Sequence, residues 1–150
     1  MRKSVDAEFA GYVASRQQRL LRAAYLVCGD ERRARDLVRR ALTELAVHWD
    51  RLRDANPDDF VNRVLYDDAV SWWHHLHHGS QPAGSDDVRR ALAALTPRQR
   101  AVLVLKYFDE QTEPEIASQL DLPLGTVQHQ AALAVERFEA ALSQPLEDAL

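Results

Sequence analysis

The sequence predicts an all-α protein made of two small helical domains joined by a short linker. Apolar residues recur at helical spacing almost throughout the 150 residues, and no segment alternates as a half-buried strand does. Helix-start signals occur at Asn56, Thr96 and Thr112. A Gly-, Ser- and Pro-containing segment, residues 79–85, interrupts the pattern, so we expect the domains to span residues 1–78 and 86–150.

The N-terminal domain opens with two predicted helices. The first runs from about Val5 to Cys28 and stops at Gly29, a residue favoured just beyond helix C-termini. Asp30 can cap the second helix, which continues to about Trp49. The inner face of this second helix is predicted to hold Ala34, Leu37, Val38, Ala41, Leu45 and Trp49.

The third helix has a distinct start signal. Asn56 suits the capping position, Pro57 suits the first helical position, and Asp58 and Asp59 complement the helix dipole. We expect this helix to continue to about Leu76.

The C-terminal domain is predicted to contain a helix-turn-helix over residues 112–142. A short helix over residues 86–95 comes first. Each of the next two helices then begins with a capping box. Thr96 and Gln99 form the first box, and Thr112 and Glu115 form the second. A Gly-containing turn leads to a long last helix with the inner stripe Val127, Ala131, Ala134, Phe138 and Leu142. A short capped helix, a tight turn and a long amphipathic helix fit the motif, although periodicity alone also allows two packed bundle helices.

The composition is that of an ordinary folded protein, with 46% hydrophobic and 28% charged residues. The single cysteine, Cys28, can form no internal disulfide. We see no signal peptide and no apolar stretch of membrane-spanning length, which predicts a cytoplasmic protein. The sequence has no phosphate-binding glycine loop, nucleophile elbow or zinc-binding cysteine pair, so we expect neither an enzyme nor a cofactor.

Charge is unevenly distributed along the chain. The formal net charge is −4, and residues 85–150 account for −5 while residues 1–78 carry +1. A nucleic-acid binder usually presents a basic surface. The half that contains the predicted helix-turn-helix is therefore the acidic half.

Short motifs in a fixed order resemble those of the extracytoplasmic-function (ECF) sigma factors. Residues 92–105, LAALTPRQRAVLVL, resemble the opening of region 4 in that family. Glu115-Ile116-Ala117 and Gly125-Thr126-Val127 resemble its helix-turn-helix. The motifs that resemble region 2 are Ala24-Tyr25-Leu26, Gly29-Asp30, Asp36-Leu37-Val38, Trp49-Asp50, Phe60-Val61, Val64-Leu65 and Ser71-Trp72-Trp73. The likeness covers residues 9–140 and is strongest to an actinobacterial group with a Ser-Trp-Trp signature.

This resemblance implies a sigma-like protein that binds core RNA polymerase and directs promoter recognition and transcription initiation. Its region 2-like domain (1–78) would bind polymerase through Asp36, Leu37, Val38, Arg39 and Arg40. The same domain would recognise and open the −10 promoter element with Phe60, Arg63, Trp72, Trp73, His74 and His75. Its region 4-like domain (86–150) would read the −35 element with Thr126, Gln128, His129, Gln130, Ala132 and Leu133.

The DNA-facing positions depart from the family pattern. Between residues 112 and 142 the chain has one basic residue, Arg137, and five acidic residues. Gln128 stands where the family usually has Lys, and Pro123 where it usually has a helix-capping Ser. Asp67 and Asp68 occupy region 2 positions where small, basic or Asn residues are usual. Each lost phosphate contact removes counterion release, a large source of DNA affinity.

Two interpretations stay open at this point. The chain is either a working sigma factor with an unusual surface, whose partners are core polymerase and promoter DNA, or a sigma-like interaction protein. In the second case it binds polymerase or a regulatory protein, such as an anti-sigma factor, without reading promoters. Both interpretations predict the same fold, because the chain retains the apolar stripes, the helix caps and the linker of the family.

Three further clusters have open roles. Five arginines of the second helix, Arg32, Arg33, Arg35, Arg39 and Arg40, form either a solvated face or a protein-docking face beside Asp36. Four histidines, His74, His75, His77 and His78, could bind a transition metal, but we expect no metal site because no carboxylate or cysteine completes the set. Trp72 and Trp73 are adjacent, so one should face the core and the other a base, a protein or the domain end.

Overall fold

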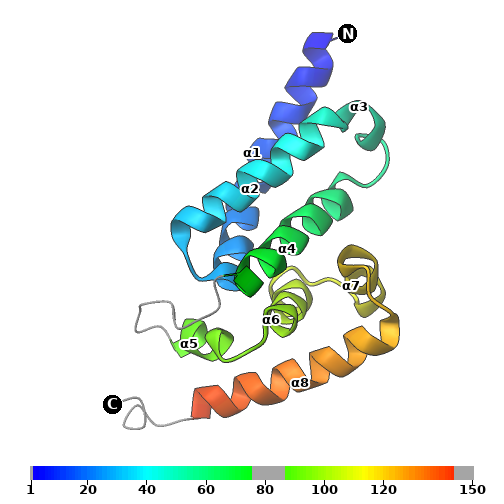
Figure 1. The fold of residues 1–150 in the computed structure, drawn as a ribbon. Coiled ribbons are helices and arrows are strands. Elements are labelled where there is room, and N and C mark those ends of the chain that lie inside the picture. The colour runs from blue at the N-terminus through cyan, green and yellow to red at the C-terminus, as the bar shows by residue number, and fades with distance from the viewer. Residues whose placement is uncertain (1, 76–86, 144–150) are drawn as a thin grey trace.

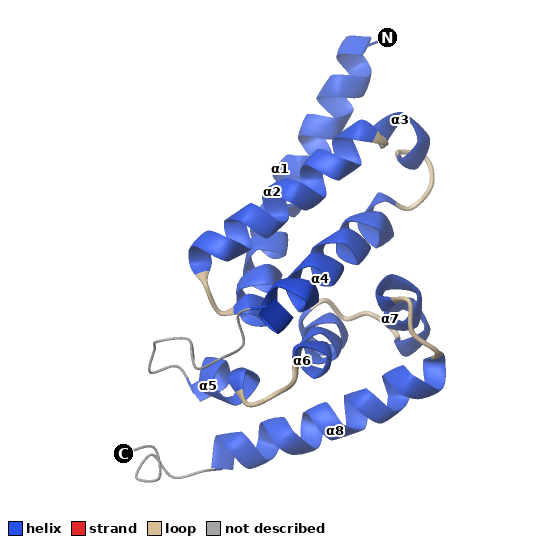
Figure 2. Ribbon diagram, viewed as in Figure 1, coloured by secondary structure: helices blue, strands red, loops and turns tan. Residues whose placement is uncertain are grey.

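The computed structural model describes residues 2–75 and 87–143, and in these ranges every regular element is a helix (Figure 2). The N-terminal half contains α1 (Arg2–Cys28), α2 (Glu31–Val47), α3 (Trp49–Leu52) and α4 (Pro57–His75). The C-terminal half contains α5 (Asp87–Ala93), α6 (Pro97–Leu103), the π-helical turn η1 (Val104–Phe108), α7 (Glu113–Leu120) and α8 (Leu124–Ser143). The prediction of an all-α fold is confirmed. The predicted linker, residues 79–85, lies outside the described residues.

The predicted helix stop at Gly29 and the predicted helix cap at Asp30 are both present between α1 and α2. Gly29 has φ of 76°, a left-handed conformation that glycine adopts without strain, and its N–H donates to the Tyr25 carbonyl at 2.8 Å. Asp30 Oδ1 accepts from the N–H groups of Arg32 and Arg33 at 2.9 and 3.2 Å. The chain therefore reverses in two residues, and α1 and α2 lie side by side (Figure 1).

The other predicted caps are also confirmed. Asn56 Oδ1 accepts from the Asp59 N–H at 3.1 Å at the start of α4. Both capping boxes are complete, Thr96 with Gln99 before α6 and Thr112 with Glu115 before α7. These local hydrogen bonds satisfy N–H groups that the helices themselves leave unpaired.

Several element ends differ from the sequence prediction. The second helix stops at Val47, because His48 leaves the helical region with φ −106° and ψ 12°, and Trp49 begins the separate turn α3. The helix that follows the Thr96 capping box changes after Leu103 into the π turn η1. Leu142, predicted to lie on the inner stripe of α8, is instead 40% exposed and lines an open groove with Val88 of α5.

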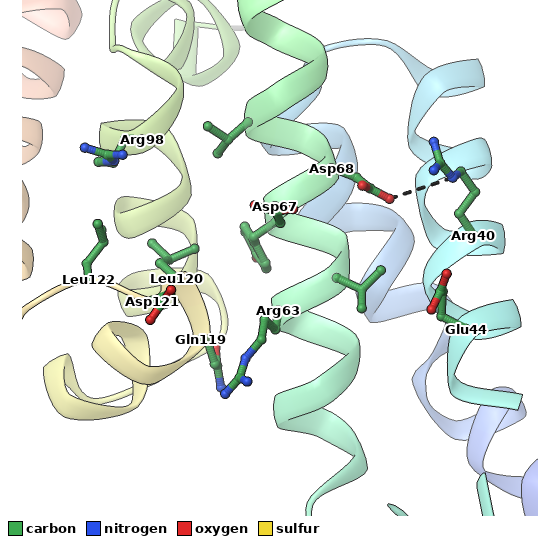
Figure 3. Close-up of a pocket in the computed structure, with 13 residues that line it drawn as sticks. Arg40, Glu44, Arg63, Asp67, Asp68, Arg98, Gln119, Leu120, Asp121 and Leu122 are labelled. Atoms are coloured by element: carbon green, nitrogen blue, oxygen red, sulfur yellow. Dashed lines mark ion pairs between the residues drawn. The ribbon is translucent and has the colours of Figure 1, made fainter. Parts of the chain in front are cut away.

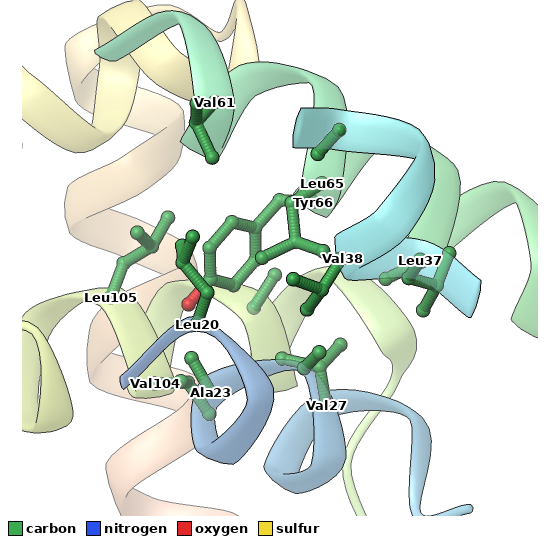
Figure 4. Close-up of a cluster of buried hydrophobic side chains, with 14 of the residues drawn as sticks. Leu20, Ala23, Val27, Leu37, Val38, Val61, Leu65, Tyr66, Val104 and Leu105 are labelled. Carbon is green, nitrogen blue, oxygen red and sulfur yellow. The ribbon is translucent and has the colours of Figure 1, made fainter. Parts of the chain in front are cut away.

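The core joins the two halves of the chain. All six residues predicted for the inner face of the second helix are buried, and Cys28 is buried beside them. In Figure 4, Leu20, Val61 and Tyr66 of the N-terminal half lie near Val104 and Leu105 of the C-terminal half. One buried cluster includes side chains from α1, α2, α4, α6, η1, α7 and α8. The halves are thus packed together, and α8 lies along the C-terminal half against α5, α6 and α7 (Figure 1).

Within the described ranges, none of the helices is both long enough and apolar enough to cross a lipid bilayer.

Candidate nucleic-acid and protein interfaces

The helix-turn-helix is formed by α7, a three-residue turn and α8. Asp121 ends α7 in the left-handed conformation, with φ 55° and ψ 51°. The Leu122 N–H donates back to the Ala117 carbonyl at 2.9 Å, which closes the turn. The Pro123 carbonyl accepts from the Val127 N–H at 3.1 Å and so starts the hydrogen-bond ladder of α8. As predicted, position 123 supplies no side-chain cap.

The two sides of α8 differ sharply in burial. Val127, Ala131 and Ala134 are buried, as the predicted stripe requires. The six residues predicted to read DNA differ in exposure. Gln128, His129 and Ala132 are exposed, whereas Thr126, Gln130 and Leu133 are half-buried. The open face therefore offers an amide, an imidazole and a methyl group.

Arg137 is the single basic residue between positions 112 and 142. Its Nη1 donates to Gln99 Oε1 on α6 at 3.2 Å. This contact turns the guanidinium toward α6. Residues 128–132 include no Lys or Arg, and weak phosphate binding by α8 stays a prediction.

The residues of α4 that are predicted to bind promoter DNA differ in burial and in their contacts. Phe60 is half-buried, with its ring centroid 5.7 Å from that of His48. Arg63 is exposed, yet its Nη2 contacts Asp59 Oδ2 at 3.2 Å and Ser118 Oγ of α7 at 3.4 Å. The α4 backbone stays helical through His75, but the side chains of Trp72, Trp73, His74 and His75 lie outside what the structure describes. His77 and His78 also lie outside the described residues, so the expectation that this cluster holds no metal site stays a prediction.

The predicted polymerase residues divide between the core and the surface. Leu37 and Val38 are each only 3% exposed, because they lie on the inner face of α2. Their side chains support the surface from beneath and cannot contact a partner in this conformation. Asp36 is half-buried, and Arg39 and Arg40 are exposed. This leaves Asp36, Arg39 and Arg40 as the accessible part of the predicted docking face.

A groove of about 440 Å³ lies between the two halves, lined by α2, α4, α6, α7 and the turn after α7 (Figure 3). Arg40 and Asp68 form an ion pair at 3.8 Å on its α2 side. Arg63 and Asp67 project from α4, and Arg98 approaches from α6. Both signs of charge line this groove, so it presents no strong field to an ion of either sign.

Polar contacts that the sequence did not reveal join the halves. Asp109 is the centre of one network: its Oδ1 accepts from Arg19 Nε at 3.0 Å, and its Oδ2 accepts from the Tyr66 hydroxyl at 3.4 Å. Burial raises the pKa of Asp109 above its ordinary value, and the hydrogen bond from Arg19 opposes this effect. In a second network, Asn62 Nδ2 on α4 donates to Gln119 Oε1 on α7 at 3.4 Å.

Arg100 is the other unpredicted contact, and it is 1% exposed. Its guanidinium donates to the carbonyls of Val27 at 2.5 Å, Leu92 at 2.9 Å and Leu95 at 3.3 Å. Val27 belongs to the last turn of α1, where the helix leaves carbonyls unpaired and the dipole favours a cation. Burial lowers the pKa of Arg100 to about 10, so the side chain stays charged at neutral pH. No spacing rule identifies such a residue, because its partners come from both halves.

Comparison with known proteins identifies the class and then the family. Residues 85–138 match the family described as Sigma-70, region 4. This range contains α5 to most of α8, so the C-terminal half has the helix-turn-helix of the sigma class of transcription proteins. The chain is 30% identical over 152 residues to the RNA polymerase sigma-E factor of Streptomyces avermitilis, covering 90% of this chain and 85% of that protein. It is 28% identical to the sigma-E factor of Streptomyces coelicolor, with 90% and 86% covered. The chain belongs to the ECF RNA polymerase sigma factors.

A solved structure shares the fold. It is the NMR structure of the PhyRSL–NepR complex from Sphingomonas sp. Fr1, with a TM-score of 0.65 and 20% identity, covering 87% of this chain and 86% of that chain. At this identity the likeness concerns the fold alone. It extends through both halves, consistent with their packing into one body.

Proposed function

We propose that the chain is a sigma factor that binds core RNA polymerase and directs promoter recognition and transcription initiation. Residues 1–78 act as its region 2-like domain and residues 86–150 as its region 4-like domain, joined by residues 79–85. The open face of α8 carries this proposal. Gln128, His129 and Ala132 remain exposed on it while Val127 and Ala131 are buried, which is what a groove-reading helix needs.

Polymerase binding is assigned to the outer face of α2. Asp36, Arg39 and Arg40 present both signs of charge there and lie over the buried Leu37 and Val38. A rigid helix with a packed inner face presents its outer side chains at fixed spacing to a protein partner. Because polymerase holds the complex on DNA, α8 needs little phosphate affinity of its own.

The packing of the halves gives the free protein a closed form. In this form α7 covers part of α4, since Arg63 contacts Ser118 and Asn62 contacts Gln119. Arg63 is a proposed contact to the −10 element. Reading two separated promoter elements therefore requires that the halves come apart when the chain binds polymerase.

The second candidate is a sigma-like interaction protein that binds polymerase or a regulatory protein without reading promoters. It is favoured by the shortage of cations on α8, where Arg137 is turned toward Gln99. A fold neighbour solved as a complex with another protein, NepR, adds support for a regulatory partner of the anti-sigma kind. Under this alternative the fold is retained for protein contacts alone.

Run-off transcription separates the two candidates. The full chain is added to core polymerase with DNA from upstream of its own gene, and transcripts are mapped. The sigma-factor proposal predicts discrete transcripts that require the chain. Core binding without any specific transcript contradicts it and favours the interaction protein.

The docking face is tested with a double charge reversal, Arg39→Glu with Arg40→Glu. Both side chains are exposed, so the variant should stay folded while its affinity for core polymerase falls by about tenfold or more. Arg51→Glu, at an exposed position of α3, is the control and should bind like the parent. Equal retention of the double variant and the control on immobilised core polymerase would remove this face from the docking surface.

A further inference from the structure

An apolar groove lies on the surface of the C-terminal half, where α5 packs beside the end of α8 (Figure 1). It has a volume of about 430 Å³ and is lined by residues of α5, α6, η1 and α8. None of the residues proposed above to read promoter DNA or to bind polymerase lines it. A groove of this volume suits a small molecule, since ligand pockets are typically about 300–1,000 Å³.

The groove has a buried apolar floor and an exposed apolar rim. Leu92 and Leu103 are buried beneath it. Val88, Tyr107 and Leu142 are 43%, 59% and 40% exposed at its rim. These are three of the five large hydrophobic side chains that are exposed in the part of the chain that the structure describes. Exposed apolar side chains that gather in one place indicate a binding site, whereas scattered ones do not.

Glu139 is the one charged residue that lines the groove. It is exposed and takes part in none of the ion pairs found among the described residues. Arg90 of α5 is paired with Asp87 at 3.4 Å. Lys106, next to the lining residue Tyr107, is paired with Glu113 at 3.1 Å. The Glu139 carboxylate is therefore available to a cation that comes from outside the chain.

The end of α8 also favours a cation in this groove. The last turn of α8 includes the lining residue Leu142 and contains no basic residue. The carbonyl groups of a last helical turn form the negative end of the helix dipole. Residues 85–150 together carry a formal net charge of −5. The local potential therefore attracts cations and repels anions.

Aromatic side chains complete the lining. Phe108 and Phe138 both line the groove and are half-buried. An aromatic face contacts flat apolar groups and attracts a cation within about 6 Å of the ring centroid. Because Phe138 directly precedes Glu139 and both line the groove, one small ligand can contact the ring and the carboxylate together.

We infer that this groove binds a small amphipathic cation, an ammonium group attached to a compact apolar group. The ammonium group pairs with Glu139 at the rim, and the apolar group contacts Phe138 and Leu103. A fatty acid or another anionic amphiphile fits less well, because no cationic side chain lines the groove. This inference does not depend on whether the chain reads promoters.

Such a ligand would act on the C-terminal half. It would contact α5, η1 and α8 at once, so its binding would stabilise their packing against one another. The ligand is thus an effector of the half that contains the helix-turn-helix, bound at a place separate from the exposed face of Gln128, His129 and Ala132.

The test compares three probes of nearly the same shape and different charge: phenylbutylamine, phenylbutanol and phenylbutyrate. Two-dimensional amide NMR spectra of the isotope-labelled full chain measure each affinity and locate each site. We expect the amine to saturate with a Kd on the order of 1 mM or below, at least about threefold tighter than the alcohol. The butyrate should bind more weakly than the alcohol. The shifted amides should include those of Val88, Tyr107 and Leu142.

Glu139→Gln removes the charge and keeps the shape of the side chain. It should weaken amine binding by about threefold or more and leave alcohol binding within about twofold of the parent. Glu136→Gln, at an exposed position of α8 outside the groove, is the matched control and should leave both probes within about twofold. Leu142→Gln should weaken the amine and the alcohol alike, because it reduces the apolar rim.

Each other outcome overturns the inference. Absence of saturable amine binding, or equal affinity of the parent for amine and alcohol, means that the groove does not select a cation. Equal weakening in Glu136→Gln means that the attraction comes from general charge. Amide shifts confined to residues outside the groove place the amine elsewhere. Concentration-dependent shifts of the groove amides without any probe assign the groove to a second copy of the chain.

Discussion

Arg100 shows how one buried side chain can join two parts of a fold. Replacing it with leucine leaves the carbonyls of Val27, Leu92 and Leu95 without its three donors. Buried acceptors that lose their partners cost about 1–3 kcal/mol each at most, so we expect Arg100→Leu to lose roughly 3 kcal/mol of unfolding free energy. Arg100→Lys should lose about half as much, because an ammonium cannot reproduce the planar fork.

Urea denaturation of the full chain measures both values. Arg98→Leu is the control, since Arg98 lies two residues earlier on α6 and is exposed. Its unfolding free energy should stay within about 0.5 kcal/mol of the parent. If Arg100→Leu were as stable as Arg98→Leu, the buried guanidinium would have no part in holding α1 to the C-terminal half.

Asp109 gives the stability of the chain a defined pH dependence. Burial raises its pKa in the folded protein, so its contribution to stability is fully present below the pKa of the unfolded chain. That contribution is lost as pH rises through the folded pKa. Asp109→Asn cannot titrate. We therefore expect the stability of the Asn variant relative to the parent to improve as pH increases from about 4, the unfolded value for Asp.

The measurement is a series of urea unfolding curves between pH 4 and pH 7. Asp50→Asn, at an exposed carboxyl on α3, serves as the control for the loss of one negative charge. Asp109→Ala removes the acceptor of both Tyr66 and Arg19 and should cost roughly 2 kcal/mol at pH 7. A relative stability of Asp109→Asn that falls with rising pH would contradict the stated direction of the pKa shift.

Periodicity predicts apolar residues of the core well and polar ones poorly. The six inner-face residues of the second helix were all predicted, because a 3.6-residue repeat fixes which side of a helix is buried. Arg100 and Asp109 follow no such repeat. Each is buried only because groups distant in the sequence, Val27 and Arg19 among them, supply its hydrogen bonds.

The α8 face predicts a gain of DNA binding from added charge. Gln128 and Ala132 are exposed and one helical turn apart, so Gln128→Lys with Ala132→Lys places two cations on the presented face without touching the buried stripe. Each new phosphate contact should add roughly 0.9 to the log–log salt slope of duplex binding. Affinity at low salt should rise accordingly.

A matched control adds the same charge elsewhere. Ala10→Lys with Ala14→Lys places two lysines one turn apart on the exposed side of α1. Duplex binding is measured by anisotropy over a range of salt concentrations. If both double variants gained equally, the effect would be that of net charge, and α8 would not be the DNA-facing helix.

Starts of elements were more predictable than their ends. The caps at Asn56, Thr96 and Thr112 could be predicted from the sequence. Each of these side chains accepts a hydrogen bond from a backbone N–H only three residues further along the chain. The break at His48 and the π turn η1 have no equivalent local signal. The π turn η1 contacts α1 and α7, which are distant from it or follow it in the sequence.

The packing of the halves was the least predictable feature of the whole molecule. It depends on contacts such as Arg19 with Asp109, separated by 90 positions in sequence. The DNA-reading role of α8 stays a prediction, with Gln128, His129 and Ala132 exposed, whereas Leu37 and Val38 of the predicted docking face belong to the core. That Arg63 contacts Ser118 of α7 could not be inferred from either half alone.

The central claim is that the free chain is closed and opens when it binds core polymerase. Spin labels at Val47→Cys on α2 and Ala140→Cys on α8 occupy exposed positions in the two halves. Native Cys28 is buried, and burial raises its thiol pKa to about 11, so it should remain unlabelled. Double electron–electron resonance then measures the distance between the labels. We predict one narrow distance distribution for the free protein and a longer distance with core polymerase bound; a broad distribution in the free protein, or an unchanged one in the complex, would contradict the claim.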